Sequence, residues 1–180
     1  MRNHSTFFRI RCVLATAATI LCTAGSASSG PKQGPLSTQN ARALERARAG
    51  AAAKLQEPEC QKVLTDFTDA RGRTLQSELE KRGLGPADYL RTIIFVDGAS
   101  IRSCRLGGWV LLVATPGLGS VGVCPAADKP FVSRLAQVQL RNAAYAESIV
   151  IHEMLHTLGL GENPPTSEEI TRRVQFRCGP

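Results

Sequence analysis

The longest apolar pattern along the chain lies in residues 143–159, AAYAESIVIHEMLHTLG. Its spacing predicts a helix, with Asn142 as the N-cap and Gly159 as the C-terminal stop. The helix carries enough large apolar side chains to be the central helix of a core. These are Ile149, Val150, Ile151, Met154, Leu155 and Leu158.

Three short apolar runs predict strands, at residues 91–98 (RTIIFVDG), 108–115 (GWVLLVAT) and 120–124 (SVGVC). The second run is apolar throughout, which implies cover on both faces and places Trp109 in the core. The turn PGLG follows it, so the third run is expected to be its hairpin partner.

Helical spacing of apolar residues also marks residues 59–67 and 74–83. Thr166 and Glu169 have the spacing of a capping box, so a final helix is expected from about Ser167. Residues 131–140 fit a helix and a strand equally well, and both alternatives stay open.

Together these elements predict an α+β fold, with a short sheet packed on the central helix over residues 59–180. Residues 28–58 are expected to be a flexible tether or a pro-segment. The first part of this segment is rich in Gly, Pro and Ser. The second part has helix formers but few large apolar groups, which favours a loosely docked helix.

Residues 1–27 resemble an export signal, with basic residues before the short apolar run 12–25 and small residues before a cleavage site near Ser28. We therefore expect an exported protein, periplasmic or extracellular, without stable membrane insertion after cleavage. The alternatives are an uncleaved anchor and lipidation at Cys22, which the bulky Leu21 disfavours.

The charge distribution argues against nucleic acid as a partner. The net charge is +7, and cleavage would remove Arg2, Arg9 and Arg11 but no acid, which leaves +4. No run of Lys or Arg is dense enough for a phosphate track, and aromatic residues make up only 5% of the chain, too few for base stacking.

Four of the six cysteines lie outside the expected signal, an even number that favours two disulfides in an exported chain. We predict the pairs Cys104–Cys124 and Cys60–Cys178. A zinc site made of the four cysteines is disfavoured because no two of them are close in sequence.

His152 and His156 are four residues apart and project from one face of the predicted central helix, where both can reach one metal ion. Glu153 is rotated by about 100° from His152 and is free to act as a general base. A catalytic zinc usually has three protein ligands. Glu162 is the leading third ligand, because Gly159 lets the chain turn back. Glu168 and Glu169 are alternatives.

The stretch HEMLHTLGLGE (residues 152–162) resembles the HExxH zinc metallopeptidases, or zincins. Its spacing HExxHxxGxxE is similar to the metzincin pattern, with an acid in place of the third histidine, as in snapalysin-like proteases. The resemblance implies His152, His156 and Glu162 as zinc ligands and Glu153 as general base, in a small zincin-like domain.

The chain departs from the metzincin pattern in two ways. No methionine follows the motif, so the methionine turn is missing, and only 18 residues follow Glu162, which makes the C-terminal part reduced. The wider pattern is similar to small exported bacterial proteins of the metallopeptidase type.

We therefore expect an exported, monomeric zinc metallopeptidase that hydrolyses peptide or amide bonds in a peptide or protein substrate. In this hypothesis Glu153 takes the proton of the zinc-bound water. The alternative is a non-catalytic, zinc-stabilised binding domain, which has no use for Glu153 as a base. Tyr89 and Tyr145 are possible oxyanion stabilisers, but a structural role is favoured for both.

Overall fold

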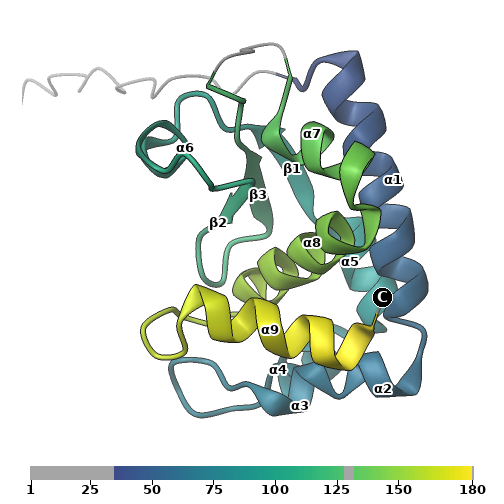
Figure 1. The fold of residues 1–180 in the computed structure, drawn as a ribbon. Coiled ribbons are helices and arrows are strands. Elements are labelled where there is room, and N and C mark those ends of the chain that lie inside the picture. The colour runs from purple at the N-terminus through teal and green to yellow at the C-terminus, as the bar shows by residue number, and fades with distance from the viewer. Residues whose placement is uncertain (1–34, 128–131, 180) are drawn as a thin grey trace, which may run out of the picture. The chain divides into compact units, whose positions relative to one another are not determined.

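The computed structural model describes residues 35–127 and 132–179, and the expected signal at residues 1–27 lies outside this part. The α+β class is confirmed: the structure combines helices with a short three-stranded sheet (Figure 1). In chain order the elements are α1 (Thr38–Lys54), α2 (Pro58–Gln61), α3 (Val63–Asp66), α4 (Leu75–Arg82), α5 (Pro86–Thr92), β1 (Ile94–Asp97), α6 (Arg102–Leu106), β2 (Leu112–Ala114), β3 (Ser120–Val123), α7 (Arg134–Arg141), α8 (Ala143–Thr157) and α9 (Ser167–Cys178).

Helix α8 is the central helix, as its apolar pattern predicts. It begins after Asn142, whose side-chain oxygen accepts a hydrogen bond from Tyr145 N at 3.0 Å. It packs against α1, α7, α9 and β2 (Figure 1). The helix ends at Thr157, and two residues further on the chain turns away at Gly159. Gly159 has a φ of 108°, which residues with a side chain rarely adopt. Both predicted ends of this helix are confirmed.

The sheet has the order β1-β3-β2, with β1 parallel and β2 antiparallel to β3. The predicted hairpin of β2 and β3 is confirmed, and in the described part of the chain β2 is an edge strand. The hairpin turn is tied to the central helix, because Gly117 N donates a 2.9 Å hydrogen bond to the carbonyl of His156. The sheet is therefore fastened to α8 beside the HExxH motif.

The prediction for Trp109 is wrong. Strand β2 begins only at Leu112, and the Gly107–Gly108 turn before it carries Trp109 outward, where the residue is 95% exposed. The apolar run of residues 108–115 therefore combines an exposed turn with a three-residue strand, and only its Leu112 is buried.

The helix predicted at residues 59–67 is interrupted, and the segment left open at residues 131–140 is a helix. Residues 59–67 form most of α2 and α3, which meet at Lys62, instead of one continuous helix. The ambiguous segment 131–140 forms α7, whose N-cap Ser133 accepts a hydrogen bond from Ala136 N. Residue 131 itself lies outside the described part.

Helix α1 differs from the loosely docked helix expected within residues 28–58. Its Ala43, Leu44, Ala47 and Ala51 are buried against the core, and α1 packs along α8. Small alanines allow two helices to approach closely, so a helix with few large apolar groups still buries a full face. The folded unit therefore begins before Glu59. A pro-segment role for residues 28–58 stays a prediction.

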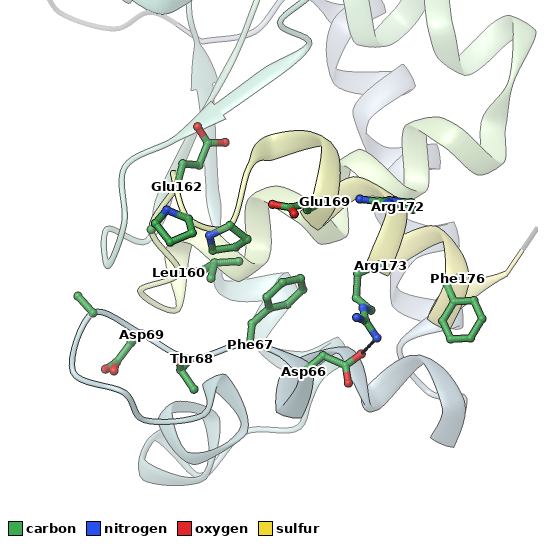
Figure 2. Close-up of a pocket in the computed structure, with 14 residues that line it drawn as sticks. Asp66, Phe67, Thr68, Asp69, Leu160, Glu162, Glu169, Arg172, Arg173 and Phe176 are labelled. Atoms are coloured by element: carbon green, nitrogen blue, oxygen red, sulfur yellow. Dashed lines mark ion pairs between the residues drawn. The ribbon is translucent and has the colours of Figure 1, made fainter.

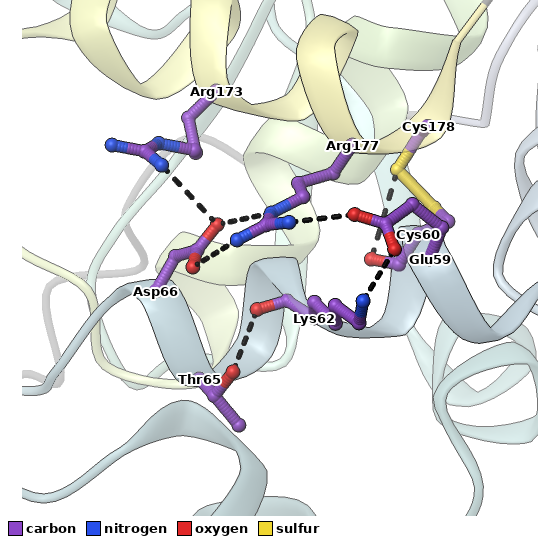
Figure 3. A network of polar contacts seen from close by, with 8 residues as sticks. All are labelled: Glu59, Cys60, Lys62, Thr65, Asp66, Arg173, Arg177 and Cys178. Carbon is purple, nitrogen blue, oxygen red and sulfur yellow. Dashed lines mark hydrogen bonds and ion pairs between the residues drawn. A yellow bond between two sulfur atoms is a disulfide. The ribbon is translucent and has the colours of Figure 1, made fainter.

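The C-terminal helix α9 is clamped to α2 and α3 by a disulfide and an ion-pair network (Figure 3). Arg177 donates to both carboxylate oxygens of Asp66, at 2.8 and 2.9 Å, and to Glu59 at 2.6 Å. The Cys60–Cys178 disulfide lies next to this network. Both predicted pairings, Cys60–Cys178 and Cys104–Cys124, are confirmed.

The two disulfides differ in the length of chain that they close, and this sets their expected effect on stability. Cys60–Cys178 spans 118 residues and Cys104–Cys124 spans 20. From loop-closure entropy, Cys60→Ser/Cys178→Ser should lower the free energy of unfolding by about 5 kcal/mol and Cys104→Ser/Cys124→Ser by about 3 kcal/mol. Urea denaturation of both double variants tests this, and an equal loss would contradict it.

Candidate metal centre

His152, His156 and Glu162 lie together, with one possible ligand atom from each within 4.8 Å of the others. The two imidazole Nε2 atoms are 3.0 Å apart. Glu162 Oε1 is 3.3 Å from Nε2 of His156 and 3.8 Å from that of His152. The alternatives Glu168 and Glu169 do not belong to this group. The leading set of three ligands is therefore the one that the fold brings together.

Local backbone geometry explains why Glu162 reaches the two histidines. The i and i+4 positions put both imidazoles on one face of α8. After the helix, Gly159 N bonds to the His156 carbonyl at 2.8 Å and Leu160 N to the Leu155 carbonyl at 3.2 Å. These bonds and the left-handed Gly159 reverse the chain, as in a Schellman-type helix end. The reversal returns Glu162 to the face that carries the histidines.

The spacing of the three atoms fits a tetrahedral metal ion. Zinc–nitrogen and zinc–oxygen bonds of about 2.0–2.1 Å place neighbouring ligand atoms about 3.3 Å apart in a tetrahedron. The observed separations of 3.0, 3.3 and 3.8 Å fall around that value. Two neutral imidazoles and a carboxylate are also a donor set that binds divalent zinc well.

Each histidine is oriented through its other ring nitrogen. His156 Nδ1 donates to the carbonyl of Leu160 at 2.8 Å, and His152 Nδ1 lies 2.9 Å from Thr171 Oγ1 on α9. A carbonyl only accepts hydrogen bonds, so the neutral His156 ring carries its proton on Nδ1 and presents the lone pair of Nε2. Hydrogen bonds of this type at Nδ1 are typical of metal-binding histidines.

Burial decides the charge state of His152. The side chain is almost fully buried, and this desolvation, together with the neighbouring His156, lowers the pKa of His152 to about 3. The imidazole is thus neutral at physiological pH, which is the form that binds metal.

Glu153 lies beside the ligand group and faces strand β2. The residue is 8% exposed. Burial raises the pKa of Glu153 to about 8, a hydrogen bond from the Ala114 backbone opposes the rise, and the charge of Glu162 adds to it. A nearby dication would favour the ionised carboxylate. Glu153 is therefore placed to exchange a proton next to the ligands without being one of them.

A pocket of about 1030 Å³ lies next to the turn that carries Glu162 (Figure 2). It is bounded by the 66–70 segment, the 160–165 turn and α9. Glu162 belongs to its lining, but the carboxylate points away from the other labelled side chains in Figure 2. Its apolar lining comes from Phe67, Leu160, Pro164, Pro165 and Phe176.

A tight loop, residues 68–74, forms one side of this pocket and is held by Asp69. Asp69 Oδ1 accepts from the backbone N–H groups of Arg71 and Arg73, and Oδ2 pairs with the Arg73 guanidinium at 2.7 Å. The Arg73 N–H and then its guanidinium lower the pKa of Asp69 to about 2. A Cβ at Gly159 would lie 3.4 Å from Asp69 Cβ, so this loop packs on the turn that follows α8.

The two tyrosines considered as oxyanion stabilisers lie outside the ligand group. Tyr89 is buried and its hydroxyl donates to Thr157 Oγ1 at 3.0 Å, which gives it a structural role. Tyr145 lies in the first turn of α8 and lines a separate, smaller pocket. Sequence reasoning missed Thr171 and the Ala114 backbone, because neither has a distinctive residue type or a fixed spacing from the motif.

Comparison of the chain with protein-family models, curated proteins and solved structures finds no match. Within residues 35–127 and 132–179, no helix is both long and apolar enough to cross a membrane. The case for a metal centre therefore depends on the geometry of the ligand group and on the motif that predicted it.

Thr171→Val should weaken metal binding without unfolding the protein. The change removes the hydroxyl that contacts His152 Nδ1 and keeps the side-chain shape, so His152 loses its orienting partner. Loss of such a partner typically costs 10–100-fold in metal affinity, roughly the effect expected here. Chelator competition with zinc measures it, with the exposed Ser167→Ala on the same helix as control. An unchanged affinity would rule out an orienting role for Thr171.

The depressed pKa of Asp69 predicts acid sensitivity. An unfolded Asp has a pKa of about 3.9, and the folded value is about 2. The carboxylate therefore stabilises the fold fully above pH about 4, and this contribution disappears as the pH falls toward 2. Asp69→Asn should be less stable than wild type at pH 7, with a difference that narrows on acidification. Urea melts across this range test it, with the exposed Asp88→Asn as control for net charge.

Proposed function

We propose that the protein is a zinc-dependent metallopeptidase that hydrolyses peptide or amide bonds. The observation that carries the proposal is the convergence of His152, His156 and Glu162 on one point with the buried Glu153 next to them. The spacing of these residues also resembles the HExxHxxGxxE form of the zincin motif. Three protein ligands leave one position of a tetrahedral ion open, as catalytic zinc sites do.

Zinc is the metal that suits this donor set best, because imidazole and carboxylate ligands in tetrahedral spacing are typical of catalytic zinc. When bound, zinc would polarise the substrate carbonyl and lower the pKa of a water molecule at the site. His152, His156 and Glu162 would hold the ion. Thr171 and the Leu160 carbonyl would keep the two rings in place.

Glu153 would carry the proton through the reaction. Its carboxylate takes a proton from the attacking water as the water oxygen bonds to the carbonyl carbon. The same proton then passes to the amide nitrogen as the C–N bond breaks, which leaves a carboxylic acid and an amine. During this transfer the Ala114 hydrogen bond would hold the carboxyl group between α8 and β2.

Two features support a peptide as the substrate. Strand β2 is an edge strand next to Glu153, and an extended peptide can pair with an exposed edge through main-chain hydrogen bonds. The apolar pocket that adjoins the 160–165 turn is large enough for a substrate side chain. Neither feature indicates a cleavage preference.

A non-catalytic, zinc-stabilised binding domain is the second candidate. The Ala114 hydrogen bond to Glu153 favours it, because this bond also gives Glu153 a structural reason to be there. In that case Glu153 would tie α8 to the sheet, and the metal would tie α8 to the 160–165 turn. The two candidates differ in what a substitution of Glu153 does.

Glu153→Gln and Glu162→Gln should have different effects. The amide at position 153 keeps the shape and can still accept the Ala114 hydrogen bond, but it cannot take a proton. Zinc content and thermal stability should therefore stay near wild type, while turnover falls at least about a hundredfold. Glu162→Gln should weaken zinc binding itself, because a neutral amide is a poorer ligand for a dication.

The measurements are elemental analysis, thermal melts and cleavage of a mixed peptide library by wild type and both variants. His152→Ala and His156→Ala, which should abolish stoichiometric zinc, are the controls for metal loss. A wild type that holds zinc and cleaves nothing would favour the binding domain. A metal-free, folded wild type in zinc-containing buffer would contradict both candidates.

A further inference from the structure

The turn formed by residues 106–109 exposes two large apolar side chains that no described residue covers. Trp109 is 95% exposed and Leu106 is 72% exposed. Tryptophan is usually largely buried in a soluble domain. Figure 1 shows α6 and the turn after it on the other side of the sheet from α1, so this turn is an outer feature of the fold.

A disulfide and two hydrogen bonds hold the turn in place. The Cys104–Cys124 disulfide fastens α6 to the end of β3. Arg134, itself buried, donates to the carbonyls of Gly107 and Val110 on either side of Trp109. The disulfide and the Arg134 hydrogen bonds fix the backbone on both sides of Trp109. The exposed position of Trp109 is therefore a defined feature of the backbone.

The surroundings of the turn are basic. Arg102 and Arg105 on α6 are exposed next to it. Residues 98–127, which contain α6, β2 and β3, include no aspartate or glutamate, and Asp97 directly before them accepts a hydrogen bond from the Ala99 backbone. Apolar side chains next to exposed arginines are complementary to a surface with an apolar interior and negatively charged head groups.

We propose that the 106–109 turn docks the protein reversibly on an anionic phospholipid surface. Trp109 and Leu106 enter the interfacial region, where an indole ring keeps its N–H near water, and Arg102 and Arg105 contact the phosphate groups. A protein partner fits less well, because a stable interface needs about 800 Å² from each side, more than two projecting side chains offer. Docking is weak because so few apolar groups enter the bilayer.

Trp109 provides its own probe, since the chain contains a single tryptophan. The full chain is titrated with phosphatidylglycerol vesicles and with phosphatidylcholine vesicles. The expected result is a blue-shifted emission, and quenching by brominated lipid, with the anionic vesicles. Both effects should decrease in about 0.5 M NaCl, where charge attraction is screened. The emission reports residue 109 whatever other parts of the chain touch the lipid.

Matched variants test the turn itself by vesicle sedimentation. Trp109→Ala and Leu106→Ala should each lower partitioning onto anionic vesicles by about tenfold or more. Leu140→Ala, which removes a leucine that is 76% exposed on α7, should have no such effect. Arg102→Glu/Arg105→Glu should abolish binding, while Arg42→Glu/Arg46→Glu makes the same charge change at exposed positions of α1 and should retain it.

Several results would overturn the proposal. One is an emission of Trp109 that anionic vesicles neither shift nor quench. Another is an equal loss of binding in the two arginine pairs, which would mean that net charge alone acts. A shift that depends on protein concentration without vesicles would assign the turn to self-association instead. None of these readouts depends on zinc or on peptide cleavage, so the outcome is independent of the proposed function.

Discussion

The burial of polar groups in α8 is the constraint on which the rest of the structure depends. Two imidazoles and a carboxyl lie in the middle of the helix that fills the core, and all three side chains are largely shielded from water. An unpaired polar group in such a place is costly. Each one therefore receives a partner from a different element: Thr171 on α9, the Leu160 carbonyl in the turn after α8, and the Ala114 backbone on β2.

The position of α9 matters because this helix carries Thr171, the partner of the buried His152. Thr171 can contact His152 only if α9 crosses α8 in a fixed place, and α9 is only 12 residues long. Its start is fixed by the capping box of Thr166 and Glu169, and its end by the disulfide to Cys60 and the Arg177–Asp66 ion pair. Helix α9 is therefore anchored at both ends, which fixes the position of Thr171 beside His152.

The features that could be predicted from the sequence are those set by residues close to one another along the chain. Asn142, Gly159 and the Thr166–Glu169 pair act within one or two turns of the backbone, so the ends of α8 and the start of α9 could be located correctly. The i and i+4 histidines and the reversal at Gly159 are local as well, which is why the sequence could indicate that His152, His156 and Glu162 lie together. Both disulfide pairings were found because few pairings were possible.

The features that were missed depend on tertiary contacts. Thr171 is 19 residues from His152, and nothing in its surroundings marks it as a partner. The burial of α1 arises from alanines that fit closely against α8, a property of the packed pair and not of the segment alone. Trp109 belongs to an apolar run, but a run of apolar residues does not show where the strand within it begins.

Strand β2 explains why that run is divided. Its last residue, Ala114, must meet Glu153, and the turn after it must bond the His156 carbonyl, so the strand is fixed at its C-terminal end by α8. At the other end Arg134 and the disulfide at Cys104 hold the chain over the end of β3. Only residues 112–114 lie between these two supports. The division of the run coincides with the contacts at its two ends, where Ala114 meets Glu153 and the Val110 carbonyl accepts from Arg134.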